Sequence, residues 1–249
     1  FRLGETCVTM TWLYLNLNLG RLTGEARFYD IAEQTLYNHL LGAQSPDGRG
    51  WAYYMGLRDS KRFRWHTDPD CCPSRGVRAL AQMPLHIVNI KDDGFVVNFY
   101  EDSKVNLHLP LGFEIKIKME TRYPFAGDVK ITVSPLEPAQ FKAYLRLPGW
   151  CQERKLEVNG VLQNVSPDIN GYLVVDRSWK SGDILELQFE MPPNIVIDKI
   201  GNNGRVAMAR GPLVYAVDNH YLPDGIILDD VILFLNKKDP AREIRLVDD

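Results

Sequence analysis

The sequence has few cysteines, no long hydrophobic run and no excess of charge of one sign. Four cysteines in 249 residues are too few for a disulfide framework, and two of them are adjacent. No hydrophobic run approaches the roughly 18 residues of a membrane-spanning helix. The 29 Lys and Arg residues balance 32 Asp and Glu residues without forming a basic stripe. This pattern argues against a nucleic acid or a membrane surface as a partner.

The length and the first residue set the expected organisation of the chain. A chain of 249 residues can hold one large domain or two ordinary ones, and a 45% share of hydrophobic residues suits a globular core. The sequence begins with Phe1 rather than methionine and leads at once into a helical pattern. We therefore expect an internal piece of a longer protein, and the lack of a signal peptide leaves its compartment open.

Helical patterns occupy the first third of the chain. The expected helices span residues 6–19, 24–44 and 73–90, with a turn at 45–48 and a short extended segment at 51–57. Thr6 is placed to cap the first helix and Gly20 to end it, and its hydrophobic residues predict burial on most sides. The third helix is expected to begin at Pro73, where proline is favoured, and to bend at Pro84.

The character of the chain changes at residues 91–94, where a charged turn precedes short strands. Residues 113–119 alternate strictly between hydrophobic and charged, so one face of that strand should be buried. The other expected strands span residues 95–100, 105–109, 129–133, 141–147, 155–158, 172–175, 184–189, 206–209 and 213–217. Many short strands with regular turns predict an antiparallel β-sandwich. We expect a helical region at 1–90 and a β-sandwich region at 91–249, and the tail after Asn219 is not assigned.

Cys71 and Cys72 stand next to each other directly before Pro73. Adjacent cysteines rarely pair, because their Cα atoms lie closer than disulfide geometry easily allows. Both thiols should lie at the N-terminus of the third helix, where the helix dipole and free N–H groups stabilise a thiolate. Two such thiols suit a metal ion, and Glu5 and Cys7 offer two further ligands. Zinc accepts one carboxylate and three thiolates in a four-coordinate site.

Each of these residues also has an ordinary structural explanation. Cys7 is a small residue of a kind that is commonly buried, and Glu5 beside a helix start commonly interacts with the helix dipole. An adjacent cysteine pair without further context is more often buried than a metal or redox site. We interpret Cys151, at the end of a strand, as structural. The histidines are expected on the surface or packed inside, and they are His39, His66, His86, His108 and His220.

Several short motifs follow one another in a specific order. The first half contains Glu5-Thr6-Cys7, Tyr37-Asn38, an aromatic segment around Tyr53, and Cys71-Cys72-Pro73. The second half contains Leu145-Arg146-Leu147-Pro148-Gly149-Trp150, Val158-Asn159-Gly160, Gly171-Tyr172-Leu173, Trp179-Lys180-Ser181-Gly182-Asp183, Gly204-Arg205-Val206-Ala207 and Arg210-Gly211-Pro212-Leu213-Val214-Tyr215. Taken in this order, they resemble glycoside hydrolase family 127, the β-L-arabinofuranosidase family. The resemblance extends to about residue 218.

The resemblance implies an (α/α)6 barrel followed by β-sandwich domains, of which this chain would hold the last barrel helices and the sandwich. It implies a Zn2+ site made of Glu5, Cys7, Cys71 and Cys72. Cys71 would be the nucleophile of a retaining glycosidase that removes terminal β-L-arabinofuranosyl groups, and Tyr53 would contact the substrate. The family's acid/base glutamate lies upstream of Glu-Thr-Cys, hence before Phe1. We therefore expect that this chain alone does not turn over substrate.

Two other hypotheses stay open at this point. One is a non-catalytic, carbohydrate-associated β-sandwich module whose cysteines hold a structural zinc, since sandwiches host many unrelated functions. The other is a relative with a different sugar specificity. The expected partner is an arabinose-containing oligosaccharide or glycan, with no nucleic acid and no membrane, and a homodimer is left open.

Overall fold

The structure is a computed structural model. It describes residues 4–56, 63–65, 71–110, 112–197, 206–217 and 222–226. His66 and His220, named above, lie outside these residues. The chain divides into two units, residues 1–190 and 191–249, and each is described by itself.

The first helix, α1 (Thr6–Thr23), ends one turn later than its sequence suggests. Gly24 adopts a left-handed conformation with φ 73°, and its N–H donates to the carbonyl of Gly20. Gly20 lies inside the helix, where an added Cβ would come 2.6 Å from the ring of Tyr29. The predicted helix end at Gly20 is therefore wrong, because this glycine serves a close helix–helix contact rather than a turn.

The start of α1 also differs from the prediction. The N-cap is Glu5, and no side chain caps this end of the helix. The hydroxyl of Thr6 instead donates to the carbonyl of Ala52, 2.6 Å away and 46 residues further along the chain. Thr6 therefore fastens the helix start to a later segment instead of capping it.

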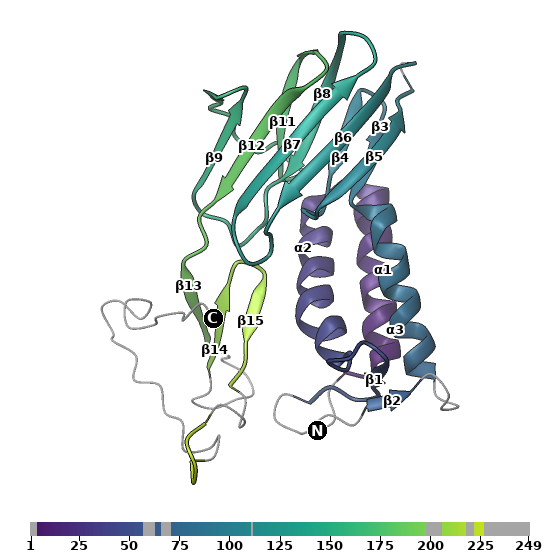
Figure 1. Cartoon of the computed structure of the whole chain (residues 1–249), viewed down its shortest axis with the longest axis vertical. Helices are drawn as coiled ribbons and strands as arrows, with labels where there is room; N and C mark the ends of the chain where they lie inside the picture. The colour runs from purple at the N-terminus through teal and green to yellow at the C-terminus, as the bar shows by residue number, and fades with distance from the viewer. Residues whose placement is uncertain are drawn as a thin grey trace. The chain divides into compact units, whose positions relative to one another are not determined.

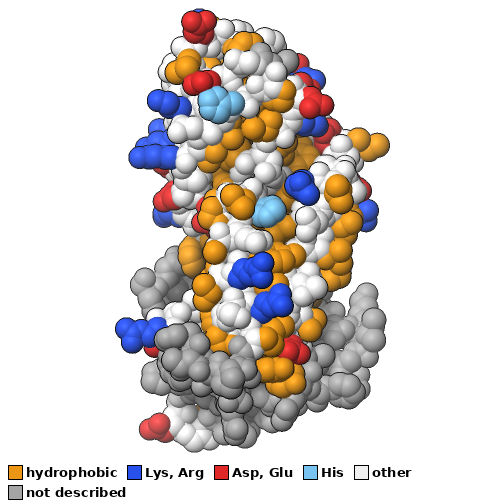
Figure 2. Space-filling view, turned by 90° about the vertical axis from the view of Figure 1, so that its right-hand side faces the viewer, with side chains coloured by type: hydrophobic (Ala, Val, Ile, Leu, Met, Phe, Trp, Pro, Cys, Tyr) orange, Lys and Arg blue, Asp and Glu red, His pale blue; other side chains and the backbone are white. Residues whose placement is uncertain are grey.

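Helix α1 is buried on one side only. Its buried hydrophobic residues are Met10, Leu13 and Leu17. A second set is exposed and consists of Val8, Trp12, Leu15 and Leu22. The prediction of burial on most sides is thus wrong for the described residues. Figure 2 shows hydrophobic side chains between scattered Lys and Arg side chains on one side of the molecule.

The rest of the helical part follows in short elements. They are α2 (Ala26–Gln34), the π-helix η1 (Thr35–Leu40), η2 (Leu41–Ala43), β1 (Gly50–Ala52), β2 (Phe63–Trp65), α3 (Cys71–Gln82) and η3 (Met83–His86). Helix α1 packs against both α2 and α3 (Figure 1). The predicted helix at 24–44 and the turn at 45–48 are confirmed.

Helix α3 corrects two further predictions. It begins at Cys71 rather than Pro73, so both cysteines lie in its first turn. The chain does not continue as a bent helix to Ile90. After η3 it enters a strand, β3 (Val88–Lys91), because Pro84 cannot continue the regular hydrogen-bond ladder.

Two facing sheets form the sandwich of the first unit. The strands are β3, β4 (Gly94–Val97), β5 (Ser103–His108), β6 (Glu114–Thr121), β7 (Asp128–Pro135), β8 (Ala139–Arg146), β9 (Arg154–Val158), β10 (Val161–Leu162), β11 (Tyr172–Trp179) and β12 (Asp183–Phe189). One sheet has the order β10-β9-β12-β7-β6-β5 and the other β11-β8-β4-β3. The predicted arrangement, helices followed by a β-sandwich, is confirmed.

One strand pair departs from the antiparallel pattern. Strand β4 pairs with β8 in parallel, with Phe95 opposite Ala143. An added Cβ on Gly94, at the start of β4, would lie 1.8 Å from the carbonyl oxygen of Lys142. Glycine is therefore required where these two backbones approach each other.

The helical part and the sandwich share a hydrophobic core. Phe99, which follows β4, meets Tyr29 of α2 edge-on with ring centroids 5.9 Å apart. Phe99 is buried in the same cluster as Leu13, Leu36 and Trp51. The predicted boundary near residue 91 stays a prediction.

The second unit contains one three-stranded sheet in its described residues. Its strands are β13 (Pro193–Ile197), β14 (Val206–Arg210) and β15 (Leu213–Tyr215), paired antiparallel in that order. In the part of the chain that the structure describes, no helix combines the length and hydrophobicity needed to cross a membrane.

Candidate active site

Four predicted ligand residues come together although 64 or more positions separate the two stretches that carry them. Glu5 and Cys7 lie at the start of α1, and Cys71 and Cys72 form the first turn of α3. One ligand atom from each residue can be chosen so that all four lie within 4.8 Å of one another. Figure 1 shows that this end of the helices, next to β1 and β2, lies away from the sandwich.

The three thiols are the closest group in this cluster. The Sγ of Cys7 lies 2.7 Å from that of Cys71 and 3.5 Å from that of Cys72, and the two adjacent sulfurs are 4.0 Å apart. The Sγ of Cys71 is 3.9 Å from Oε1 of Glu5. In a tetrahedral zinc site, bonds of about 2.3 Å place sulfurs about 3.8 Å apart. Two of the three sulfur pairs match this spacing, and the third is shorter.

The thiols differ in their access to solvent. Cys72 is fully buried, Cys7 is half-buried and Cys71 is exposed. Burial, together with the neighbouring thiols, raises the pKa of Cys7, and burial also raises the pKa of Cys72. Crowded thiols resist ionisation in the absence of a cation, because each thiolate repels the next. A bound dication reverses this preference.

Glu5 is held by backbone hydrogen bonds to the segment after β1. The N–H of Thr6 donates to the carbonyl of Tyr53 (3.0 Å), and the N–H of Met55 donates to the carbonyl of Gly4 (2.9 Å). Glu5 itself forms an antiparallel bridge with Tyr54. The carboxylate of Glu5 therefore lies before the first helical turn, so it can reach the same point as Cys7 despite being only two residues away.

The structure also brings Tyr53 to the cluster. A hydrogen bond between its hydroxyl and the Glu5 carboxylate, together with the charge of Glu5, raises the pKa of Tyr53. The ring lies beside that of Tyr54, with centroids 4.6 Å apart. The hydroxyl is therefore a neutral donor that orients the carboxylate of Glu5.

Helix α3 and β1 are in direct contact one turn after the cysteines. Gly76, one turn after Cys72, leaves space for the buried indole of Trp51, which an added Cβ would approach to 2.3 Å. This contact places the segment that carries Tyr53 next to the first turn of α3.

Some residues around the site were missed by sequence reasoning. His39, interpreted as surface or packed, lies against Gly4, and its Nδ1 is 3.1 Å from the hydroxyl of Thr9. Nothing in the local sequence pattern marks this contact, since it depends on how η1 meets the start of α1. Cys151 agrees with its structural interpretation, because it is buried and its thiol donates to the carbonyl of Glu153.

Comparison with known families gives a match over both parts of the first unit. A family model described as the β-L-arabinofuranosidase GH127 catalytic domain matches residues 2–85. A second, described as the GH127 middle domain, matches residues 94–191. The chain belongs to glycoside hydrolase family 127.

Individual members of family 127 are similar over most of this chain. A non-reducing end β-L-arabinofuranosidase of Bifidobacterium longum is 25% identical over 261 residues, which is 90% of this chain and 38% of that protein. A crystal structure of a GH127 β-L-arabinofuranosidase from Geobacillus stearothermophilus T6 has a TM-score of 0.79 at 28% identity. A GH127 β-arabinofuranosidase structure has a TM-score of 0.78 at 31% identity. Each structure match covers 84% of this chain and 36% of the other.

This family 127 chain thus spans less than two fifths of the length of the relatives described here. The similarity includes the helical part and the sandwich, so it extends to the elements that carry the cysteine cluster.

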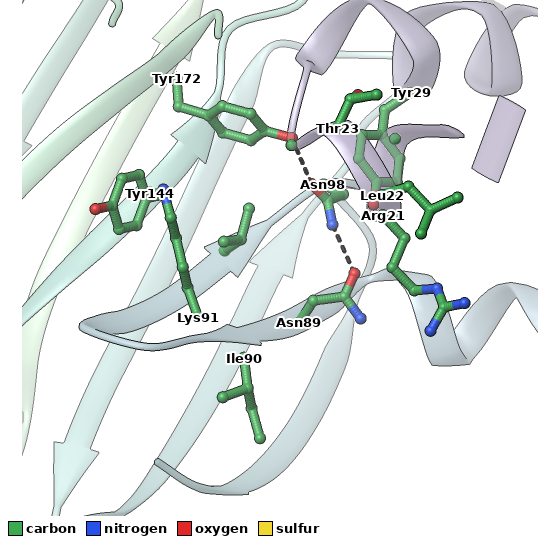
Figure 3. A pocket seen from close by; sticks show the side chains of 13 residues that line it. Arg21, Leu22, Thr23, Tyr29, Asn89, Ile90, Lys91, Asn98, Tyr144 and Tyr172 are labelled. Atoms are coloured by element: carbon green, nitrogen blue, oxygen red, sulfur yellow. Dashed lines mark hydrogen bonds between the residues drawn. The ribbon is translucent and has the colours of Figure 1, made fainter. Parts of the chain in front are cut away.

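A cavity of about 310 Å³ lies elsewhere in this family 127 chain, at the other end of α1. Figure 3 shows Tyr172 donating to Asn98, which donates in turn to Asn89. The described residues that line this cavity include none of the four predicted metal ligands. Because these polar groups bond to one another, we assign the cavity to the junction of helices and sandwich and not to the site.

Proposed function

We propose that this chain is part of a retaining glycosidase that removes terminal β-L-arabinofuranosyl groups, with Cys71 as its nucleophile. The observation that carries the proposal is the cluster of three thiols and one carboxylate in a chain of family 127. The proposal keeps residues 1–90 as the C-terminal part of the catalytic domain and 91–249 as the β-sandwich region. Its substrate would be an arabinose-containing glycan.

The chemistry of the donor set fits zinc. The residues that would hold the ion are Glu5, Cys7, Cys71 and Cys72. Sulfur-rich sites with one oxygen ligand favour zinc over magnesium or calcium, which prefer oxygen alone. A bound Zn2+ would keep the thiols ionised and in position at neutral pH.

Exposure supports Cys71 as the nucleophile among the three thiols. Cys72 is buried and Cys7 half-buried, whereas Cys71 faces solvent at the first turn of α3. Of the three sulfurs, that of Cys71 is therefore the most open to a sugar. Neighbouring N–H groups of the helix start favour negative charge at this position.

The proposed reaction has two displacements at the anomeric carbon. The sulfur of Cys71 forms a bond to this carbon as its bond to the leaving-group oxygen breaks, and an acid protonates that oxygen. Water, deprotonated by the same group as base, then displaces the sulfur, so the configuration is retained. The acid/base is expected upstream of Phe1, as the family resemblance implies. Tyr53 orients Glu5 by donating its hydroxyl proton, and its hydroxyl oxygen can accept a hydrogen bond from the sugar.

A structural zinc in a non-catalytic carbohydrate module is the second candidate. The observation in its favour is that three sulfurs and one carboxylate already complete a four-coordinate site, as in closed structural sites. A nucleophilic Cys71 in the full-length protein should be alkylated by a halogenated or epoxide sugar mimic, with protection by arabinose. An inert Cys71 in the zinc-bound, folded protein would favour the structural site.

The direct test is zinc per chain in purified, folded protein. We expect about one zinc per chain in the wild type and its loss in Cys72→Ser. Cys151→Ser is the matched control, since it removes a buried thiol outside the cluster and should keep the zinc. A wild type that circular dichroism reports as folded but that contains no zinc would contradict the metal site.

Activity gives a second test. The isolated chain should not hydrolyse an aryl β-L-arabinofuranoside, because the acid/base is expected upstream. Hydrolysis by the isolated chain that disappears in Cys71→Ala would contradict the expected place of the acid/base. It would support the nucleophile at the same time.

A further inference from the structure

His39 contacts the turn that carries Glu5. Its Nδ1 lies 3.1 Å from the hydroxyl of Thr9, and this hydroxyl donates to the carbonyl of Glu5 (3.2 Å). The ring fills the space beside Gly4, where an added Cβ would lie 2.1 Å from the ring carbon Cε1. Gly4 has φ 73°, so the turn is both left-handed and closely packed.

The element that carries His39 is unusual. Residues Thr35–Leu40 form one π-helical stretch inserted between α2 and η2. π-Helical turns are rare and occur often at functional sites. Two core side chains hold η1 in place, since Leu36 and Leu40 are buried with the helices. A hydrogen bond also fixes this π-helix, because the hydroxyl of Tyr37 donates to the carboxylate of Glu101, 2.6 Å away.

The Gly4–Glu5 turn is thus held by two separate segments of the chain. The segment after β1 holds it through the N–H groups of Thr6 and Met55. The π-helix contacts it through the ring of His39, which packs on Gly4 and meets the hydroxyl of Thr9 on α1. His39 is not one of the four clustered candidate ligands. It contacts the turn that carries Glu5 and not the cluster of ligand atoms.

We propose that His39 is a positioning residue of this site: its ring holds the Gly4–Glu5 turn so that the Glu5 carboxylate lies beside the three thiols. The inference rests on the proposed metal site. Residues that orient a metal ligand commonly change metal affinity 10-fold to 100-fold when they are removed. The ring supplies two things at once, a polar atom for Thr9 and a flat surface for Gly4.

The test compares three variants of the full 249-residue chain. His39→Ala removes both contacts, and His39→Asn keeps a polar atom near the place of Nδ1. Leu36→Ala is the matched control, because it removes a buried core side chain from the same π-helix. Zinc affinity is measured by competition with a chromophoric chelator, and Co2+ absorption reports the ligand geometry.

We expect His39→Ala to weaken zinc binding about 10-fold to 100-fold and to alter the Co2+ spectrum. His39→Asn should recover most of the affinity, and Leu36→Ala should lower the melting temperature with little change in affinity. Affinity within about twofold of the wild type in His39→Ala would overturn the inference. An equal loss in Leu36→Ala would do the same, since the effect would then be one of general stability.

A second measurement needs no metal. In the metal-free chain, His39→Ala should speed hydrogen exchange at the N–H groups of Thr6 and Met55, which bond across the turn, more than Leu36→Ala does. Equal exchange in the two variants would overturn the inference. A wild type without zinc affinity but with the expected exchange pattern would contradict the proposed metal site and leave the positioning contact supported.

Discussion

The guanidinium of Arg146 on β8 and the carboxylate of Glu33 on α2 form an ion pair that solvent does not reach. Arg146 also bonds to Asp30 and to the carbonyl of Asn98. Burial alone would lower the pKa of Arg146, but the charge of Glu33 raises it well above its usual value. The arginine therefore stays charged, and it joins the helical part to the sandwich by bonds that neither part can make alone.

Arg146→Met should destabilise the chain strongly, because it leaves the buried carboxylate of Glu33 without its positively charged partner. Removal of one member of a buried pair costs about 3–5 kcal/mol. The double variant with Glu33→Leu should lose less than the sum of the single effects. Urea unfolding of the four proteins gives the comparison. Lys118→Met, in an exposed pair with Glu120, is the control and should change little.

Gly76→Ala should lower both stability and zinc affinity, although alanine is the better helix former by about 1 kcal/mol. The added methyl group collides with the ring of Trp51, and overpacking of this kind costs about 1–3 kcal/mol. Val77→Ala, at an exposed position of the same helix, should leave both unchanged. Thermal unfolding and chelator competition measure the two effects. A stabilised Gly76→Ala chain would show that α3 and β1 do not pack as described.

Metal removal should destabilise the folded chain. Zinc that binds the folded state alone, at 100 times its Kd, adds about 2.7 kcal/mol to the free energy of unfolding. A chelator should therefore lower the melting temperature of the wild type and of Cys151→Ser. In Glu5→Gln, which weakens one ligand, the chelator should lower the melting temperature by less. A chelator that leaves the wild type unchanged would argue that no metal is bound.

Asp183 should make the stability of the sandwich depend on acid pH. Burial tends to raise its pKa, but hydrogen bonds from the N–H of Lys180 and the amide of Asn159, together with Arg177, lower it overall. The ionised carboxylate of Asp183 therefore adds its full stabilisation to the folded state above the ordinary aspartate pKa of about 3.9. This stabilisation is lost as the pH falls through the lower pKa of Asp183 in the folded state. Asp183→Asn should lower the free energy of unfolding at pH 7, because a neutral amide replaces the charged acceptor of these hydrogen bonds. Urea unfolding between pH 2 and 7 should show the two proteins converging at low pH.

The periodicity of the sequence predicted most elements but not their limits. The alternation at 113–119 led directly to β6, because a strand with one wet face repeats every two residues. Gly20 was taken as a helix end because glycine often ends helices. Its actual role depends on Tyr29, which no local pattern reveals. The parallel pairing of β4 with β8 depends in the same way on residues nearly 50 positions apart.

By itself, the sequence determined the order of helices and strands, the resemblance to family 127 and the four candidate ligands, because residue types and their spacing carry this information. Only the tertiary structure decided that these ligands meet, that Cys71 alone of the three thiols is exposed, and that His39, Tyr53 and Arg146 have their present partners. The physical reason is that these contacts join segments 30 to 116 residues apart. The contacts of the candidate ligands, Tyr53 and His39 form only when the helices pack on one another, and those of Arg146 form only when the sandwich packs on the helices.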